Sequence, residues 1–302
     1  MSSLTVPLSR PVLRPVSTPS GRAFRKASRT GRSLLLHAIL IGIGLVYIFP
    51  FIWTVGSALK TNAEFFSQGM NPFPGGALQW ENFSKAWGEA NFSQFMINTL
   101  FVATATAILS LPLASITAYT IARLDLPGKN AILALVGLLF LLPQGYTIIS
   151  TYELFGKLHL LTSLWPIVIV LSIGSTPVNT FFLYGFMRTI PIELDEAALI
   201  DGATVWQRYL YLMVPLSRPM LGTLGLFMFL RGWNEFFLSL VFTLGSPALR
   251  TLSVGMYAFQ GVNSRDWTLI CAGATISIIP VVILFIFLQR YVVEAFAGAV
   301  KS

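Results

Sequence analysis

The sequence contains few charged residues. Lysine, arginine, aspartate and glutamate make up 11% of its 302 residues, whereas hydrophobic residues make up 55%. An average globular protein is roughly 25% charged. This composition excludes an ordinary water-soluble domain and indicates an integral membrane protein. Cysteine is scarcer still, because Cys271 stands alone in the sequence and can form no intrachain disulfide.

Two kinds of chemical site are also missing. No G-x-x-x-x-G-K-[ST] phosphate loop occurs. Gly128-Lys129 has the Gly-Lys pair of this motif, but Arg123 occupies the position of its first glycine. No second metal-type residue accompanies His37, which favours an interfacial residue over a metal ligand. The sequence therefore predicts no cofactor or metal site in this chain, and it gives no reason to expect an enzyme.

Long apolar runs take the place of these features. A helix needs about 20 residues to cross the hydrocarbon core of a bilayer. Runs of that order lie at about 34–56, 97–122, 131–150, 164–187, 219–242 and 268–289. We therefore expect an all-α integral membrane protein with six transmembrane helices.

Basic residues predict how these helices are oriented. Lysine and arginine are concentrated in the N-terminal tail and after the second, fourth and sixth runs, and cytoplasmic segments carry such an excess. Both termini are thus predicted to face the cytoplasm. The surplus of the net charge of +8 lies mostly in the first 32 residues, which favours a tail on anionic lipid over a nucleic-acid site. Residues 1–33 are predicted to be this disordered tail, and residues 34–302 a single transmembrane domain.

A polar stretch between the fourth and fifth runs, at about 188–218, predicts a short helix that ends at glycine. Carboxylates favour the positive end of a helix dipole, and proline needs no amide partner in a first turn. The residues that supply this turn are Pro191, Glu193, Asp195 and Glu196. Asp201-Gly202 would end the helix, because glycine adopts the left-handed conformation at little cost.

A second short helix is predicted directly after the first. Thr204 and Gln207 have the spacing of a capping box, in which each side chain satisfies an amide at the helix start. Pro215 is predicted to end this helix. The stretch therefore reads as two short helices that meet at a bend, on the cytoplasmic side by the orientation above.

The fifth run contains a polar cluster at membrane depth, formed by Arg231, Trp233, Asn234 and Glu235. Arg231 and Glu235 are four residues apart and would share a helix face, so an internal ion pair is one interpretation. The other interpretation is a water-filled pathway, in which Trp233 stacks on a polar solute while the amide and carboxylate bind its hydroxyl groups. The residues alone leave both open.

The stretch EAALIDGA followed by VWQRYLYLMVP resembles the cytoplasmic-loop signature of importer permeases of the ATP-binding cassette superfamily. The positions of that signature are occupied by Glu196, Ala197, Ala198, Gly202, Leu212 and Pro215. Other stretches, including WNEFF, TLSVGMYAFQG and LQRYVVEAFAGAVKS, look like the smaller of the two maltose-type carbohydrate permeases. The resemblance covers roughly residues 34–301, and Arg231 departs from it, because an uncharged residue is expected there.

The resemblance implies the permease subunit of a sugar importer in a bacterial or archaeal cytoplasmic membrane. Its partners would be a second, homologous permease, two ATPase subunits that bind ATP and magnesium, an extracytoplasmic solute-binding protein and membrane lipid. The residues that would couple this chain to an ATPase are Glu196, Ala197, Ala198, Asp201, Gly202, Leu212 and Pro215. Glu196 would then be a docking contact and not a catalytic acid.

Two other classes of protein are alternatives to the importer permease. A proton-coupled secondary carrier needs no ATPase, but such carriers commonly show inverted repeats and paired midplane charges, and neither is clear here. An intramembrane enzyme would use Glu235, Arg231 or His37, but the sequence lacks a second catalytic carboxylate, a nucleophile–base pair and a metal set.

Overall fold

The computed structural model describes residues 20–89, 91–141, 145, 147–262 and 266–300. All regular structure in these residues is helical, which confirms the predicted all-α class. The elements are α1 (Ser20–Ala58), α2 (Asn62–Gln68), α3 (Glu81–Glu89), α4 (Phe92–Arg123), α5 (Lys129–Leu141), α6 (Ile148–Lys157), α7 (Trp165–Thr189), α8 (Ile192–Ile200), α9 (Val205–Gln207), η1 (Arg208–Met213), α10 (Val214–Leu216), α11 (Arg218–Trp233), α12 (Phe237–Phe242), η2 (Pro247–Leu249), α13 (Leu252–Val262) and α14 (Trp267–Val300).

Four helical segments are long and apolar enough to cross a membrane. They are Ser33–Ala58 of α1, α4, α7 and Trp267–Ala295 of α14. The segments Val205–Leu216 and Arg218–Trp233 make a fifth if the bent pair counts as one span. Four of the predicted runs are thus recovered as continuous helices of sufficient length.

The other two predicted runs differ from the expectation of continuous helices. The run at 131–150 is helical over α5, and residues 142–144 and 146 lie outside the described part of the chain. The run at 219–242 is divided between α11 and α12, because the helix stops at Trp233. An apolar run sets the length of a span, but the polar residues inside it interrupt the helix.

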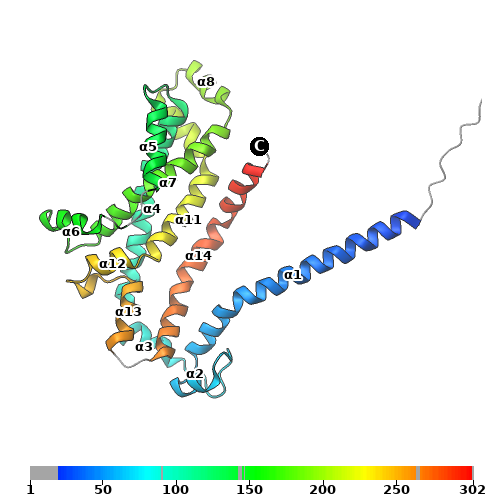
Figure 1. The fold of residues 1–302 in the computed structure, drawn as a ribbon, viewed down its shortest axis with the longest axis vertical. Coiled ribbons are helices and arrows are strands. Elements are labelled where there is room, and N and C mark those ends of the chain that lie inside the picture. The colour runs from blue at the N-terminus through cyan, green and yellow to red at the C-terminus, as the bar shows by residue number, and fades with distance from the viewer. Residues whose placement is uncertain (1–19, 90, 142–144, 146, 263–265, 301–302) are drawn as a thin grey trace, which may run out of the picture. The chain divides into compact units, whose positions relative to one another are not determined.

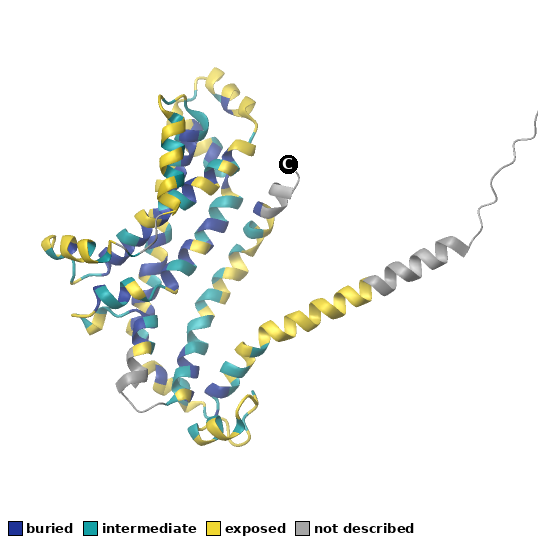
Figure 2. Ribbon diagram, viewed as in Figure 1, coloured by how far each residue is buried: buried dark blue, intermediate teal, exposed yellow. Residues whose placement is uncertain are grey.

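The chain forms two compact units, residues 1–52 and residues 53–302, which divide within α1. Of the predicted tail, residues 1–19 lie outside the described residues, and α1 begins at Ser20. Within the first unit, residues 33–52 expose apolar side chains along nearly their whole length, as in Leu40, Val46 and Tyr47 (Figure 2). Such a surface needs lipid or another protein to cover it.

The second unit is built around the helix pair α4 and α7, with α11 packed against α4 and α14 packed against α11 (Figure 1). Alanine, serine and threonine recur along α4, and small side chains let membrane helices approach closely. A fully buried polar seam joins α4 to α7: Asn179 Nδ2 donates to Ser110 Oγ at 2.8 Å, and Ser110 Oγ lies 3.0 Å from Ser175 Oγ. These bonds give Asn179 Nδ2 and Ser110 Oγ partners that water cannot supply there.

The two ends of this bundle are different in character. We call them the α8 end and the α3 end, after the helices that lie there (Figure 1). At the α3 end, Asn98 Nδ2 donates to the carbonyl oxygens of Ala248 and Arg250 at 2.8 and 2.9 Å, and Leu252 N donates to Thr99 Oγ1 at 2.7 Å. The start of α4 therefore anchors the segment that leads into α13.

Candidate functional site

The first short helix of the polar stretch forms as predicted. Helix α8 starts directly after Pro191, and Glu193 and Asp195 lie in its first turn. It ends at Ile200 with Asp201 as its C-cap, and Gly202 follows with a φ of 81°. This positive φ favours glycine, because a Cβ atom is strained there. The local signals therefore predicted both ends of the helix.

The capping box of the second helix is also present. Gln207 N donates to Thr204 Oγ1 at 3.3 Å, and Thr204 N donates to Gln207 Oε1 at 2.8 Å. The helix then widens into the π-helix η1 and continues through α10 to Leu216. The helix ends at Leu216, one residue beyond the end predicted at Pro215.

A bend of 76° separates the segment Val205–Leu216 from α11. We call residues 192–216, from α8 to α10, the coupling element. It joins α7 to α11 at the α8 end of the bundle (Figure 1). The sequence predicted two helices meeting at a bend near Gly202, and the structure adds this second bend at Ser217.

A buried ion pair joins the two halves of the coupling element. Arg208 Nη1 donates to Asp195 Oδ2 at 2.8 Å, and the side chains are 9% and 6% exposed. Asp195 was predicted only as an acidic residue in a first helical turn. The pair was missed because its partners are 13 residues apart, and no local pattern connects them. Burial makes each charge depend on the other.

Three side chains of α4 reach the coupling element or the carbonyl groups just before it. Arg123 Nη2 donates to Met187 O at 2.8 Å and to Ile190 O at 2.6 Å, at the end of α7. Tyr119 Oη donates to Val205 O at 3.5 Å. Tyr209 Oη donates to Ser115 Oγ at 3.1 Å. No prediction from sequence included these contacts, although the i, i+4, i+8 spacing on α4 was a usable signal.

The outer surface of the coupling element is apolar with an acidic rim. Leu199, Ile200 and Trp206 are exposed, Ile200 by 85%. Of the residues predicted to couple to an ATPase, four are exposed and three are partly buried. The exposed residues are Glu196, Ala197, Asp201 and Gly202, and the partly buried residues are Ala198, Leu212 and Pro215. The structure thus places most of the predicted docking residues on one accessible element.

The polar cluster of the fifth run lies at a break in the helix. Trp233 is the last residue of α11 and is 6% exposed, with its ring stacked on Phe229 at 5.5 Å. Asn234 is exposed and donates from Nδ2 to Leu230 O at 2.8 Å. Glu235 Oε1 accepts a hydrogen bond from Leu238 N at 2.8 Å, in the first turn of α12. The break therefore turns Asn234 outward and Trp233 inward.

Arg231 and Glu235 lie on either side of the end of α11. Arg231 is in the last turn of the helix, and Glu235 lies two residues beyond it. Next to Arg231, a Cβ atom on Gly232 would lie 2.7 Å from Ala103 Cα, so α11 meets the backbone of α4 here.

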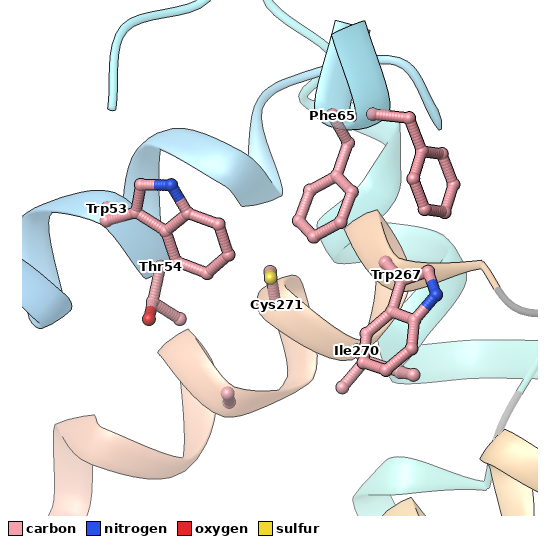
Figure 3. Close-up of a pocket in the computed structure, with 8 residues that line it drawn as sticks. Trp53, Thr54, Phe65, Trp267, Ile270 and Cys271 are labelled. Carbon is pink, nitrogen blue, oxygen red and sulfur yellow. The ribbon is translucent and has the colours of Figure 1, made fainter. Parts of the chain in front are cut away.

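A pocket of about 580 Å³ lies at the α3 end, between the end of α1, helix α2 and the start of α14. Figure 3 shows Trp53, Phe65, Trp267 and Cys271 around it. Its lining is almost wholly apolar, so it offers few hydrogen bonds to a polar solute. In the part of the chain that the structure describes, no group of three His, Cys, Asp or Glu residues could hold a metal ion.

Several helices of the chain are long and apolar enough to span a membrane, so the chain is a multi-pass helical membrane protein. The coupling element lies at one end of these helices. Residues 36–297 match the family described as binding-protein-dependent transport system inner membrane components. The chain therefore belongs to this family of transport permeases, as its loop signature indicated.

Similar proteins include permeases of several sugar transport systems. The sulfoquinovosyl glycerol transport system permease protein SmoH of Agrobacterium fabrum is 34% identical over 256 residues, which cover 84% of this chain and 89% of SmoH. The diacetylchitobiose uptake system permease protein NgcG of Streptomyces coelicolor is 30% identical over 270 residues, which cover 88% and 86%. A bacterial ABC transporter involved in the import of the acidic polysaccharide alginate contains a chain of similar fold, with a TM-score of 0.74, 21% identity, and coverage of 92% of this chain and 100% of that chain.

Proposed function

We propose that this chain is the permease subunit of an ATP-binding cassette importer that moves a sugar or oligosaccharide into a bacterial or archaeal cell. The family match over residues 36–297 carries the proposal, and the sugar transport systems named for its relatives favour a carbohydrate. Hydrolysis takes place on partner ATPase subunits that bind ATP and magnesium, and this chain has no catalytic role. The chain lies in the cytoplasmic membrane.

The coupling element is the proposed docking site for an ATPase subunit. It exposes the large apolar side chains Leu199, Ile200 and Trp206, and exposed apolar side chains of this kind are covered where proteins meet. Glu196 is also exposed and is available for a charge-assisted hydrogen bond to a basic partner. Ala197 and Ala198 add little bulk and allow close contact.

The proposed topology is six spans with both termini in the cytoplasm. Helix α5 would form the third crossing together with the residues after it, and α11 with α12 would form a broken fifth crossing. The excess of lysine and arginine in the tail and after the second, fourth and sixth runs supports this orientation. It puts the α8 end on the cytoplasmic side, where ATPase subunits are found.

The remaining partners follow from alternating access. A second, homologous permease would complete the pathway, and an extracytoplasmic binding protein would deliver the solute at the α3 end. ATPase closure would move the coupling element and rock the spans as rigid bodies. Membrane lipid would cover the exposed apolar surface of α1 where no subunit does.

The break between α11 and α12 is the proposed contribution of this chain to the pathway. Irregular backbone at membrane depth is tolerated where it lines a cavity or is buried in protein. Asn234 and Glu235 offer an amide and a carboxylate at this break, and Arg231 adds a cation on the last turn of α11. Trp233 supports the break from within the core, where it stacks on Phe229.

The first test is purification of the chain from a native membrane, followed by uptake assays in proteoliposomes. We expect two ATPase subunits, a second permease and a binding protein to copurify, and the sugar bound by that binding protein identifies the solute. Uptake should require ATP. Uptake that persists after ATP depletion, with a proton gradient maintained, would identify a secondary carrier instead.

The second test concerns docking. Proline cannot adopt the φ of 81° at position 202. We expect Gly202→Pro to abolish solute-stimulated ATP hydrolysis while the chain stays inserted in the membrane. Gly44→Ala in α1, where a Cβ atom meets nothing within 4 Å, serves as the control. Wild-type coupling in Gly202→Pro would overturn the proposed docking site.

A further inference from the structure

Ser115, Tyr119 and Arg123 occupy one face of α4, because they are four residues apart in sequence. Each contacts a different point along the path from α7 through the coupling element. Arg123 binds the carbonyl groups of Met187 and Ile190 just before α8. We call these three residues of α4 the α4 ladder.

Ser115 and Tyr119 contact the second half of the coupling element. Tyr119 donates to Val205 O, and its ring lies 5.4 Å from the ring of Tyr209. Tyr209 in turn donates to Ser115 Oγ at 3.1 Å. Ser115, Tyr119 and Tyr209 are all buried, so water does not compete for these groups.

We propose that the α4 ladder, together with the ion pair of Asp195 and Arg208, transmits movement of the coupling element to the membrane helices. This rests on the proposed function, in which an ATPase moves that element. Ser115, Tyr119, Arg123 and Arg208 are positioning residues in this proposal, because their side chains bond other parts of the same chain.

The ion pair has a distinct part in this arrangement. Helix α8 contributes Leu199 and Ile200 of the docking surface, but the ladder bonds that reach the coupling element itself lie in α9 and η1. The only polar link found between α8 and η1 in the described residues is the pair of Asp195 with Arg208. A push on α8 therefore reaches η1 through this buried pair as well as through the chain.

The packing of α4 determines which membrane helices would move with it. Helix α4 packs most extensively against α7, and next against α11. At its α8 end it shares a buried cluster with both helices, in which Ala118 and Tyr119 meet Leu183, Met187, Met213 and Leu224. Close-packed interiors transmit displacement because they have few voids to absorb it. Movement of α4 thus carries α7 and α11 with it.

The test compares variants of the full-length chain in the complete complex in proteoliposomes. The readouts are ATPase retention, the rate of ATP hydrolysis, and the amount of solute taken up per ATP hydrolysed. Tyr209→Phe removes one hydroxyl group and keeps the ring packing. We expect the uptake per ATP to fall about two- to tenfold, the range that one neutral hydrogen bond spans, with ATPase retention unchanged.

A second variant removes the same hydrogen bond from the other side. Ser115→Ala should lower the ratio to a similar extent, and the double variant should be no worse than either single variant, because both remove one interaction. Thr120→Val is the matched control on α4, since the Thr120 hydroxyl donates to Ile116 O within the same helix. Its ratio should stay at the wild-type value.

The ion pair is tested by exchange of its charges. Asp195→Arg alone should lower the ratio more than Tyr209→Phe, and Asp195→Arg with Arg208→Asp should restore part of it. If Tyr209→Phe does not insert, Ser115→Ala decides the question. Wild-type ratios in both hydrogen-bond variants, or equal loss of hydrolysis and uptake so that the ratio is constant, would overturn the α4 ladder. Failure of the proposed function is recognised separately, because the wild-type complex would then show no ATP-driven uptake.

Discussion

Two of the departures from regular α-helix in the last third of the chain, the π-helix η1 and the break at residues 234–236, are opposite in kind. The π-helix η1 turns Arg208 and Tyr209 inward, where each finds a partner on another element. The break at residues 234–236 turns Asn234 outward, and the polar bonds of Asn234 and Glu235 go to nearby backbone groups. The π-helix η1 thus bonds to both α8 and α4, and the break at 234–236 leaves an exposed amide at Asn234.

This difference fits the two proposed roles, coupling to an ATPase and lining a solute pathway. A coupling element has to move as a body, and the buried pair of Asp195 with Arg208 joins its two halves. A solute pathway needs polar groups that can exchange partners with a passing molecule, so they are accessible and held only locally. π-helical turns recur at functional sites in proteins, and this one brings two neighbouring residues to two different partners.

Of the variants that test this comparison, Asp195→Ala is expected to lower the free energy of unfolding the most. The variant leaves the Arg208 charge buried without its carboxylate, which costs about 3–5 kcal/mol. Unfolding of the detergent-solubilised chain by a denaturing surfactant measures this loss. Glu193→Ala is the control, because Glu193 lies in the same helical turn and is exposed. Equal stability of the two variants would mean that the ion pair holds nothing together.

Gly232→Ala tests the packing that supports the break. The added Cβ atom would lie 2.7 Å from Ala103 Cα, and backbone of α4 cannot move aside easily. We expect a loss of about 1–3 kcal/mol from overpacking. Gly225→Ala in the same helix is the control, since its Cβ atom would meet only the end of the Leu111 side chain at 3.4 Å. A fully stable Gly232→Ala would contradict the close approach of α11 to α4.

Gly202→Ala is expected to have a smaller effect. Nothing lies within 4 Å of the added Cβ atom, so the cost is that of the left-handed conformation alone, about 1–2 kcal/mol. Limited proteolysis of the coupling element and solute-stimulated ATP hydrolysis report this loss. Gly185→Ala in α7, which also meets nothing within 4 Å, should not share it. A sensitive Gly185 variant would point to a general effect of added bulk.

The smallest effect on stability is expected for Asn234→Ala at the break. The side chain is exposed and bonds only the carbonyl group of Leu230, so the change in unfolding free energy should stay within about 0.5 kcal/mol. The uptake rate should nevertheless fall, if the amide binds the solute. Glu235→Gln tests the carboxylate of the same break, because it keeps an oxygen acceptor for Leu238 N and removes the charge. Unchanged uptake in both variants would remove the break from the proposed pathway.

Local patterns predicted the parts of the site that depend on neighbouring residues. The ends of α8, the left-handed Gly202 and the capping box of Thr204 with Gln207 follow from propensities within a few residues. The helical class and four continuous spans follow from apolar composition. The end of the second helix has the same local origin. It was predicted at Pro215 and lies one residue later, at Leu216, because proline disfavours continuation of a regular helix.

By itself, then, the sequence determined that the chain is a helical membrane permease with a capped, bent element between its fourth and fifth apolar runs. Tertiary structure alone decided that Asp195 pairs with Arg208, that Tyr209 reaches Ser115, and that Trp233 packs inward while the helix stops beside it. The physical reason is distance along the chain. Caps and turns are satisfied by residues three or four positions away, whereas a buried charge or hydroxyl takes whichever partner the packing of distant helices brings within reach.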